Sequence, residues 1–174
     1  MIALDGVKAG ALLFVAAVIQ VSILNGVTVL GGTPDLLLVT LCAVALLRGS
    51  MFGALGGFFA GLVVDTATLD TMGLTALLLT LVGYWIGRYG ETTGRGRYAP
   101  LLSVGVVTIL YALAALLIRF MLGEGGSPEA VLLDALPPGL LLNLLIAMPV
   151  FWFCRWILSL GHEAHPVREV RLIE

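Results

Sequence analysis

The sequence predicts an all-α integral membrane protein, a compact bundle of six transmembrane helices that forms one domain over residues 1–174. The first observation behind this prediction is composition, because 60% of the 174 residues are hydrophobic, only 11% are charged and the mean hydropathy is +1.09. So little polar surface cannot cover a soluble globule. The second is a series of apolar runs separated by turn residues, and the third is the distribution of basic residues between those runs.

The apolar runs set the number of helices. A membrane-spanning helix needs about 20 mostly apolar residues, so the chain has room for six or seven spans at most and no sizeable soluble domain. Turn-forming stretches such as Asn25-Gly26, Gly31-Gly32-Thr33-Pro34, Arg48-Gly49-Ser50 and Gly90-Glu91-Thr92-Thr93 separate the runs. The predicted spans are residues 7–24, 34–48, 51–68, 72–88, 98–122 and 137–160.

The first two spans have unusual features. Lys8 precedes an apolar stretch as in a signal peptide, but no convincing cleavage site follows, so we expect this helix to be retained. The second span is short. Asp35 opens it after Pro34 and suits the first turn of a helix. Arg48 at its far end disfavours a re-entrant loop, so we expect a short span that thins the membrane or is shielded by neighbouring helices.

The third and fourth spans carry regularly spaced glycines. Gly53, Gly57 and Gly61 are four residues apart and form one stripe on a helix, and Gly83 and Gly87 repeat the spacing on the next span. Interior glycines cost roughly 1 kcal/mol each relative to alanine in water, and in lipid they permit close backbone approach. The stripe therefore predicts either packing between the protein's own helices or a groove for the transmembrane helix of a partner.

Two opposite charges are predicted at similar depth near the outer ends of their spans. Asp65 follows the glycine stripe in the third span and Arg119 lies in the fifth. Both would be costly in hydrocarbon, so the expected arrangement is an intramembrane ion pair. Two alternatives remain open: a carboxylate that moves protons or contacts a substrate, and an Asp65 that simply reaches the outer interface.

The last span and the loop before it contain further candidates. Asn143 can form hydrogen bonds between helices, and Pro149 should kink the sixth span. Ser127-Pro128-Glu129 has the pattern of a helix start, which would place Leu132 and Leu136 on the apolar side of a short outer helix. Such a helix would lie on the membrane surface or contact a periplasmic partner segment.

The basic residues predict the orientation, because short loops rich in Lys and Arg stay in the cytoplasm. With six spans and a cytoplasmic amino terminus, only Arg119 of the nine basic residues lies outside. Both termini are then cytoplasmic, and the three tryptophans lie towards the inner interface. The inner residues are Lys8, Arg48, Arg88, Arg95, Arg97, Arg155, Arg168 and Arg171.

Signals for chemistry are weak. The two histidines, His162 and His165, follow the last span, so no serine or cysteine within the membrane has a histidine base, and no cluster has metal-ligand spacing. Cys42 and Cys154 lie in apolar runs, where cysteine behaves as a small hydrophobe. We expect no enzyme, metal, cofactor or nucleic-acid partner. The classes that remain are a small-molecule carrier or binder, an assembly partner of membrane proteins, and a lipid-handling protein.

The middle of the chain resembles a known family. The motif residues run from Thr33-Pro34-Asp35-Leu36-Leu37-Leu38 through Gly56-Gly57-Phe58-Phe59-Ala60-Gly61-Leu62-Val63-Val64-Asp65 and Met72-Gly73-Leu74 to Leu81-Val82-Gly83-Tyr84-Trp85-Ile86-Gly87-Arg88. Together they are similar to MreD, the bacterial rod shape-determining membrane protein. The resemblance covers about residues 33–90, with Pro34, Asp35, Asp65 and Tyr84 as motif residues.

The resemblance implies a function. Members of the family are non-enzymatic components of the elongasome in the inner membrane, where they act with the scaffold MreC, MreB filaments, and RodA with its partner transpeptidase. It also implies a fold similar to the S components of energy-coupling-factor transporters. That likeness supplies the alternative, a membrane component that binds or transports a small vitamin-like molecule, although the outer loops offer few polar or aromatic groups for such a ligand.

Overall fold

The computed structural model describes residues 2–29, 31–68, 72–93, 98–121 and 136–159. These residues form an all-helical fold with no strand, as predicted, and their one β-type contact is an isolated bridge between Val29 and Gly32. The elements are α1 (Ile2–Ser22), the 3-10 turn η1 (Leu24–Gly26), α2 (Leu36–Arg48), α3 (Ser50–Thr68), α4 (Leu74–Thr93), α5 (Ala99–Met121) and α6 (Leu136–Ser159).

Two helix ends differ from the predicted span ends by more than two residues. Helix α1 begins at Ile2, five residues before the expected start of the first span at residue 7. Helix α4 continues to Thr93, so Gly90 and Glu91, which were expected in a turn, are helical. The extension of α4 has a consequence for its neighbour, because Glu91 contacts the first residue of α3.

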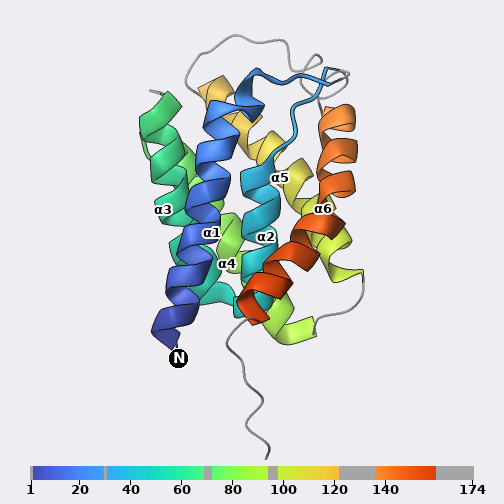
Figure 1. Ribbon diagram of the computed structural model, residues 1–174. Helices are drawn as coiled ribbons and strands as arrows, with labels where there is room; N and C mark the ends of the chain where they lie inside the picture. The colour runs from blue at the N-terminus through green and yellow to red at the C-terminus, as the bar shows by residue number, and fades with distance from the viewer. Residues whose placement is uncertain (1, 30, 69–71, 94–97, 122–135, 160–174) are drawn as a thin grey trace, which may run out of the picture.

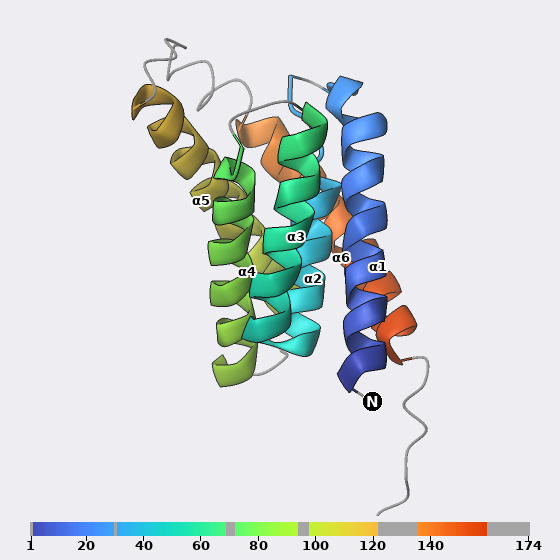
Figure 2. The same cartoon turned by 90° about the vertical axis from the view of Figure 1, so that its left-hand side faces the viewer.

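Helix α2 lies in the middle of the bundle (Figures 1 and 2) and contacts α1, α3, α4, α5 and α6. Its 13 residues reach about 20 Å at 1.5 Å per residue, short of the ~30 Å hydrocarbon core. Every residue from Leu37 to Leu46 is buried. The shortest helix is therefore covered by its neighbours over most of its length, which is one of the two arrangements expected for it.

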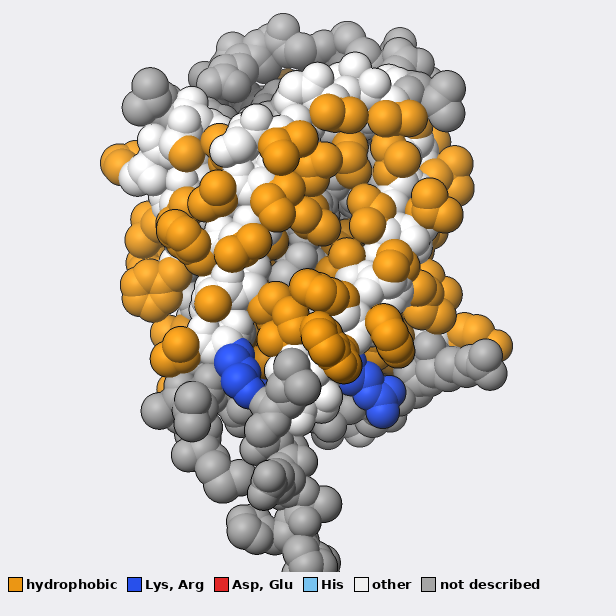
Figure 3. Space-filling model, viewed as in Figure 1, with side chains coloured by type: hydrophobic (Ala, Val, Ile, Leu, Met, Phe, Trp, Pro, Cys, Tyr) orange, Lys and Arg blue, Asp and Glu red, His pale blue; other side chains and the backbone are white. Residues whose placement is uncertain are grey.

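The bundle has two chemically different ends. The side of the bundle with the start of α1 and the end of α6 carries Arg48, Arg88 and Arg155, and we call it the arginine end. The opposite side carries Asp35 and Asp65 at the start of α2 and the end of α3, and we call it the aspartate end. On the face seen in Figure 3, hydrophobic side chains cover the surface between the ends and the basic side chains gather at the arginine end.

Helix α6 bends along its length (Figure 1), and its second half runs obliquely across the bundle at the arginine end. Pro149 lies inside this helix. Proline removes a backbone hydrogen bond and clashes with the preceding turn, which explains a kink at this position, as the sequence predicted.

Apolar side chains remain exposed on the outside of the bundle, including Phe59, Trp85, Phe120 and Leu145. Among the described residues, two helices are long and apolar enough to cross a membrane, Ser50–Thr68 and Leu136–Ser159. Shorter apolar stretches occupy Gly6–Ser22, Leu36–Arg48 and Ala99–Ala114. Six spans therefore remain a prediction, whereas the all-helical fold is confirmed.

Candidate functional site: a capped helix pair and a polar junction

The glycine stripe of α3 lies against α4 of the same chain. A Cβ atom added to Gly53 would overlap the carbonyl oxygen of Gly83, and one added to Gly57 would overlap that of Leu79. At Gly61 the added atom would overlap the backbone of Ala76. The two backbones are therefore in direct contact, which only glycine permits at these positions.

The contact is reciprocal. A Cβ atom on Gly83 would overlap the Gly53 carbonyl, and one on Gly87 would overlap the backbone of Ser50. All five glycines singled out in the sequence thus lie in one antiparallel interface between α3 and α4. Of the two interpretations offered by the spacing, internal packing describes their position in this structure.

Asp65 lies at the aspartate end of this interface and is fully buried. Its Oδ2 accepts hydrogen bonds from the backbone N–H of Gly73 at 2.9 Å and of Ala76 at 3.2 Å, and its Oδ1 accepts one from Thr75 at 3.2 Å. The carboxylate of α3 therefore caps the first turn of α4, where unpaired N–H groups and the helix dipole both favour an anion. The side chain of Arg119, its predicted partner, lies outside the described residues.

The chain before α4 is shaped for this cap. Gly73 has a φ of +92°, in the left-handed region that glycine adopts without a steric penalty. A Cβ atom at Gly73 would meet nothing within 4 Å, so its backbone conformation, and not crowding, explains the glycine. This turn brings three amides to one carboxylate.

Glu91 forms the matching cap at the arginine end. Its Oε1 accepts hydrogen bonds from the backbone N–H of Ser50 at 2.7 Å and from the Ser50 hydroxyl at 2.9 Å. Its Oε2 lies 3.4 Å from the Nη1 of Arg88. The hydrogen bonds from Ser50, and then the nearby Arg88, lower the pKa of the Glu91 carboxyl. The sequence does not predict this contact, because Gly90-Glu91-Thr92-Thr93 is typical of a turn.

A polar junction joins four helices at the start of α2. The backbone N–H of Asp35 donates to the Oδ1 of Asn143 on α6 at 2.8 Å, and that of Leu36 donates to the Oε1 of Gln20 on α1 at 2.8 Å. The Nε2 of Gln20 donates a hydrogen bond to the Pro34 carbonyl oxygen at 3.2 Å, and the Nδ2 of Asn143 donates one to the Thr108 hydroxyl on α5 at 3.2 Å. Two side-chain amides thus satisfy the non-helical backbone before α2.

Two further motif residues have distinct positions. Asp35 was expected in the first turn of α2 but lies one residue before the helix, as its N-cap. Its carboxylate accepts a hydrogen bond from the Leu38 N–H at 2.9 Å. Tyr84 is exposed on α4 and packs edge-on against Trp85. Gln20 was not predicted, although an amide within an apolar run was an available signal.

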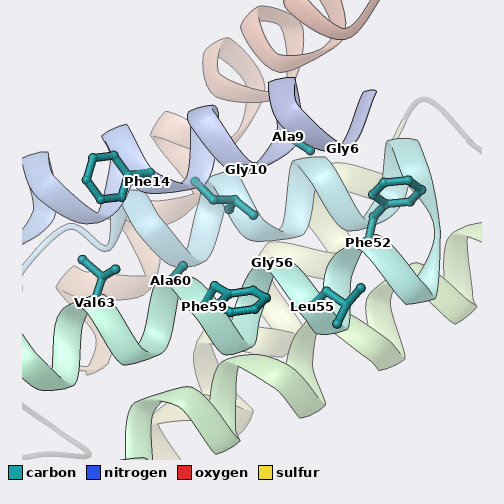
Figure 4. A pocket seen from close by; sticks show the side chains of 11 residues that line it. Gly6, Ala9, Gly10, Phe14, Phe52, Leu55, Gly56, Phe59, Ala60 and Val63 are labelled. Carbon is teal, nitrogen blue, oxygen red and sulfur yellow. The ribbon is translucent and has the colours of Figure 1, made fainter. Parts of the chain in front are cut away.

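An apolar groove of about 390 Å³ lies between α1 and α3 (Figure 4). Small residues from both helices form part of it, with Gly6, Ala9 and Gly10 on α1 and Gly56 and Ala60 on α3. Leu13 occupies the space that a Cβ atom on Gly56 would need, whereas a Cβ atom on Gly10 would meet nothing within 4 Å. None of the described residues that line the groove is charged.

One of the remaining predicted residues lies at the start of α6. Leu136 is the first residue of that helix and is half-buried. Leu132 and the predicted helix start at residues 127–129 lie outside the described residues. Whether these residues form a short outer helix therefore stays a prediction.

Comparison with known families gives one decisive match. The family model of the rod shape-determining protein MreD matches residues 6–159, which include all six helices apart from the first residues of α1. The chain belongs to the MreD family. It is thus a rod shape-determining membrane protein, as the sequence resemblance implied. No curated protein and no solved structure gives a match.

The MreD match includes both capping carboxylates, the glycine interface and the polar junction. The family is one of shape-determining proteins and not a known enzyme family. Within the described residues, no group of three or more His, Cys, Asp or Glu side chains is arranged to hold a metal. In this MreD-family chain the side chains of Gln20, Asp65, Glu91 and Asn143 connect its own helices.

Proposed function

We propose that this chain is a six-span component of the cell-elongation complex in the bacterial inner membrane, with both termini in the cytoplasm. It binds and positions MreC and acts through it with MreB, RodA and the partner transpeptidase of RodA. It catalyses no reaction and needs no cofactor. The observation that carries this proposal is the match of the MreD family model to residues 6–159.

The distribution of charge supports the orientation. Arg48, Arg88 and Arg155 come from three different helices and lie at one end of the bundle. Basic residues concentrate on the cytoplasmic side of membrane proteins, so the arginine end faces the cytoplasm in this proposal. The aspartate end, with the polar junction, then faces the periplasm.

The use of polar groups supports a scaffold. In the described part of the chain, every buried side-chain nitrogen or oxygen has a hydrogen-bond partner. The carboxylates of Asp65 and Glu91 and the amides of Gln20 and Asn143 connect helices to each other. A bundle fixed in this way presents a constant apolar surface to the transmembrane helix of a partner.

Co-purification from nanodiscs tests the proposal. The parent chain should recover MreC, whereas Gly57→Leu, which separates α3 from α4, should lose MreC and fail to restore rod shape. Phe59→Leu, an exposed neighbour on the same helix, is the matched control and should behave as the parent. Recovery of an energising ATPase module in place of MreC would contradict the proposal and favour the vitamin-like binding or transport component.

Leu132 and Leu136 are the proposed periplasmic contact. A cysteine crosslinking scan over residues 129–136 should give adducts to MreC with a helical period that includes these two positions. Adducts on all helical faces, or on none, would contradict a contact at this segment. The fold similarity to S components of energy-coupling-factor transporters stays a prediction from the family resemblance.

A further inference from the structure

The last turns of α6 present an exposed patch of one cation and two indole rings. Arg155 and Trp156 follow Trp152 by three and four residues, so the three side chains share one face of the helix. The exposed fraction is 73% for Trp152 and 54% for Trp156, and Arg155 is also exposed. On the opposite face, Cys154 and Leu158 are buried in the bundle. We call Trp152, Arg155 and Trp156 the α6 patch.

The position of the α6 patch is fixed by two features of the fold. The bend at Pro149 directs the second half of α6 across the arginine end (Figure 1). At that end the Nη2 of Arg48 donates a hydrogen bond of 2.7 Å to the carbonyl oxygen of Leu158. A cation at the last carbonyls of a helix is favourable, so α2 holds the end of α6 in place.

The surroundings of Arg155 differ from those of the other two arginines at the arginine end. Arg88 lies beside Glu91, and Arg48 bonds the end of α6. Arg155 makes no hydrogen bond or ion pair with any residue that the structure describes, and its guanidinium is exposed. Indole rings favour the membrane–water interface, where their N–H groups donate to polar partners. The patch thus combines a positive charge, hydrogen-bond donors and apolar rings.

We propose that the α6 patch binds the headgroup of an anionic phospholipid. The Arg155 guanidinium pairs with the lipid phosphate, because its fork of N–H donors matches phosphate oxygens. The indoles of Trp152 and Trp156 lie against the glycerol and upper acyl chains. The proposal requires only that the end of α6 lies at a membrane interface, and among the described residues α6 is one of two helices apolar and long enough to cross a membrane. It is independent of MreC binding.

Quenching of tryptophan fluorescence by brominated lipids tests this proposal on the full-length chain. The chain has three tryptophans, so Trp85→Phe leaves only the two in the patch. This variant is reconstituted in phosphatidylcholine bilayers that contain either brominated phosphatidylglycerol or brominated phosphatidylcholine. We expect phosphatidylglycerol to bind roughly fivefold more strongly at the quenched site, the effect of one basic residue near an anionic lipid surface. Raising the salt concentration should reduce that preference.

Matched variants separate this site from general attraction to the arginine end. Arg155→Gln should abolish the preference for phosphatidylglycerol, and Arg155→Lys should retain most of it. Arg88→Gln removes an equal charge from the same end, but from a residue already paired with Glu91, and should retain the preference. Equal quenching by the two brominated lipids in the Trp85→Phe protein would overturn the proposal. An equal loss in the Arg88→Gln and Arg155→Gln variants would overturn it as well.

Discussion

The two ends of the α3–α4 pair use the same chemistry in different surroundings. At the aspartate end, Asp65 of α3 caps α4, is fully buried and accepts three backbone hydrogen bonds. At the arginine end, Glu91 of α4 caps α3, its side chain is 40% exposed and it accepts one backbone hydrogen bond. Each helix thus supplies the anion for the start of the other.

The two sites differ in what can satisfy the backbone N–H groups once the carboxylate is removed. Water can reach the Ser50 amide at the exposed end, so the loss of Glu91 leaves a solvated helix start. The amides of Gly73, Thr75 and Ala76 donate to the fully buried Asp65 carboxylate from part-buried or buried positions, where an unpaired N–H costs about 1 to 3 kcal/mol. The buried end should therefore dominate the stability of the pair.

The largest effect is expected for Asp65→Ala. It removes a fully buried carboxylate that accepts bonds from three amides and should lower the free energy of unfolding by about 3 kcal/mol. Unfolding in mixed detergent micelles measures the loss, and Asp65→Asn should recover part of it because one amide oxygen remains as an acceptor.

A double-mutant cycle with Arg119→Gln isolates the predicted ion pair, since a coupling energy near zero assigns the whole loss to the cap.

The second largest effect is expected for Gly57→Leu, which acts midway between the two caps. The side chain would overlap the Leu79 backbone, and overpacking of this kind costs typically 1 to 3 kcal/mol. We expect about 2 kcal/mol in the same unfolding assay. Phe59→Leu changes an exposed position on the same helix and should leave stability within about 0.5 kcal/mol of the parent. Equal losses in the two variants would contradict close packing at the stripe.

A smaller effect is expected for Asp35→Ala, whose carboxylate accepts a single backbone bond at the start of α2. Loss of an N-cap of this kind costs typically about 1 kcal/mol. The Asp35 N–H bond to Asn143 is made by the backbone and persists in the variant. If Asp35→Ala lowered the free energy of unfolding as much as Asp65→Ala, burial and the number of hydrogen bonds would not determine how much each cap stabilises the protein.

The smallest effect is expected for Glu91→Ala, because its site is exposed. The lowered pKa of Glu91 gives this cap a pH dependence with a definite sign. Its contribution is fully present above the ordinary carboxyl pKa and is lost as the pH falls through the lowered value. The difference in thermal midpoint between parent and Glu91→Ala should therefore shrink on acidification. A difference that grows at low pH would contradict the assigned hydrogen bonds.

The helices themselves could be predicted from the sequence, because apolar runs and turn residues are local signals. The four-residue spacing of Gly53, Gly57 and Gly61 indicated close backbone contact, but not that α4 provides it. Asp65 was expected to need a partner, yet its three amides come from a turn shaped by Gly73, which spacing alone does not reveal. Gln20 and Glu91 were missed because their partners lie in segments that meet only in the folded bundle.

Amide hydrogen exchange, measured residue by residue in the folded protein, tests the contrast between the two caps most directly. The N–H groups of Gly73, Thr75 and Ala76 should be strongly protected in the parent and lose that protection in Asp65→Ala. The Ser50 N–H should exchange faster than these three in the parent, and Glu91→Ala should affect it alone. Protection of Ser50 equal to that of Ala76, or unchanged protection of Ala76 in Asp65→Ala, would contradict the account.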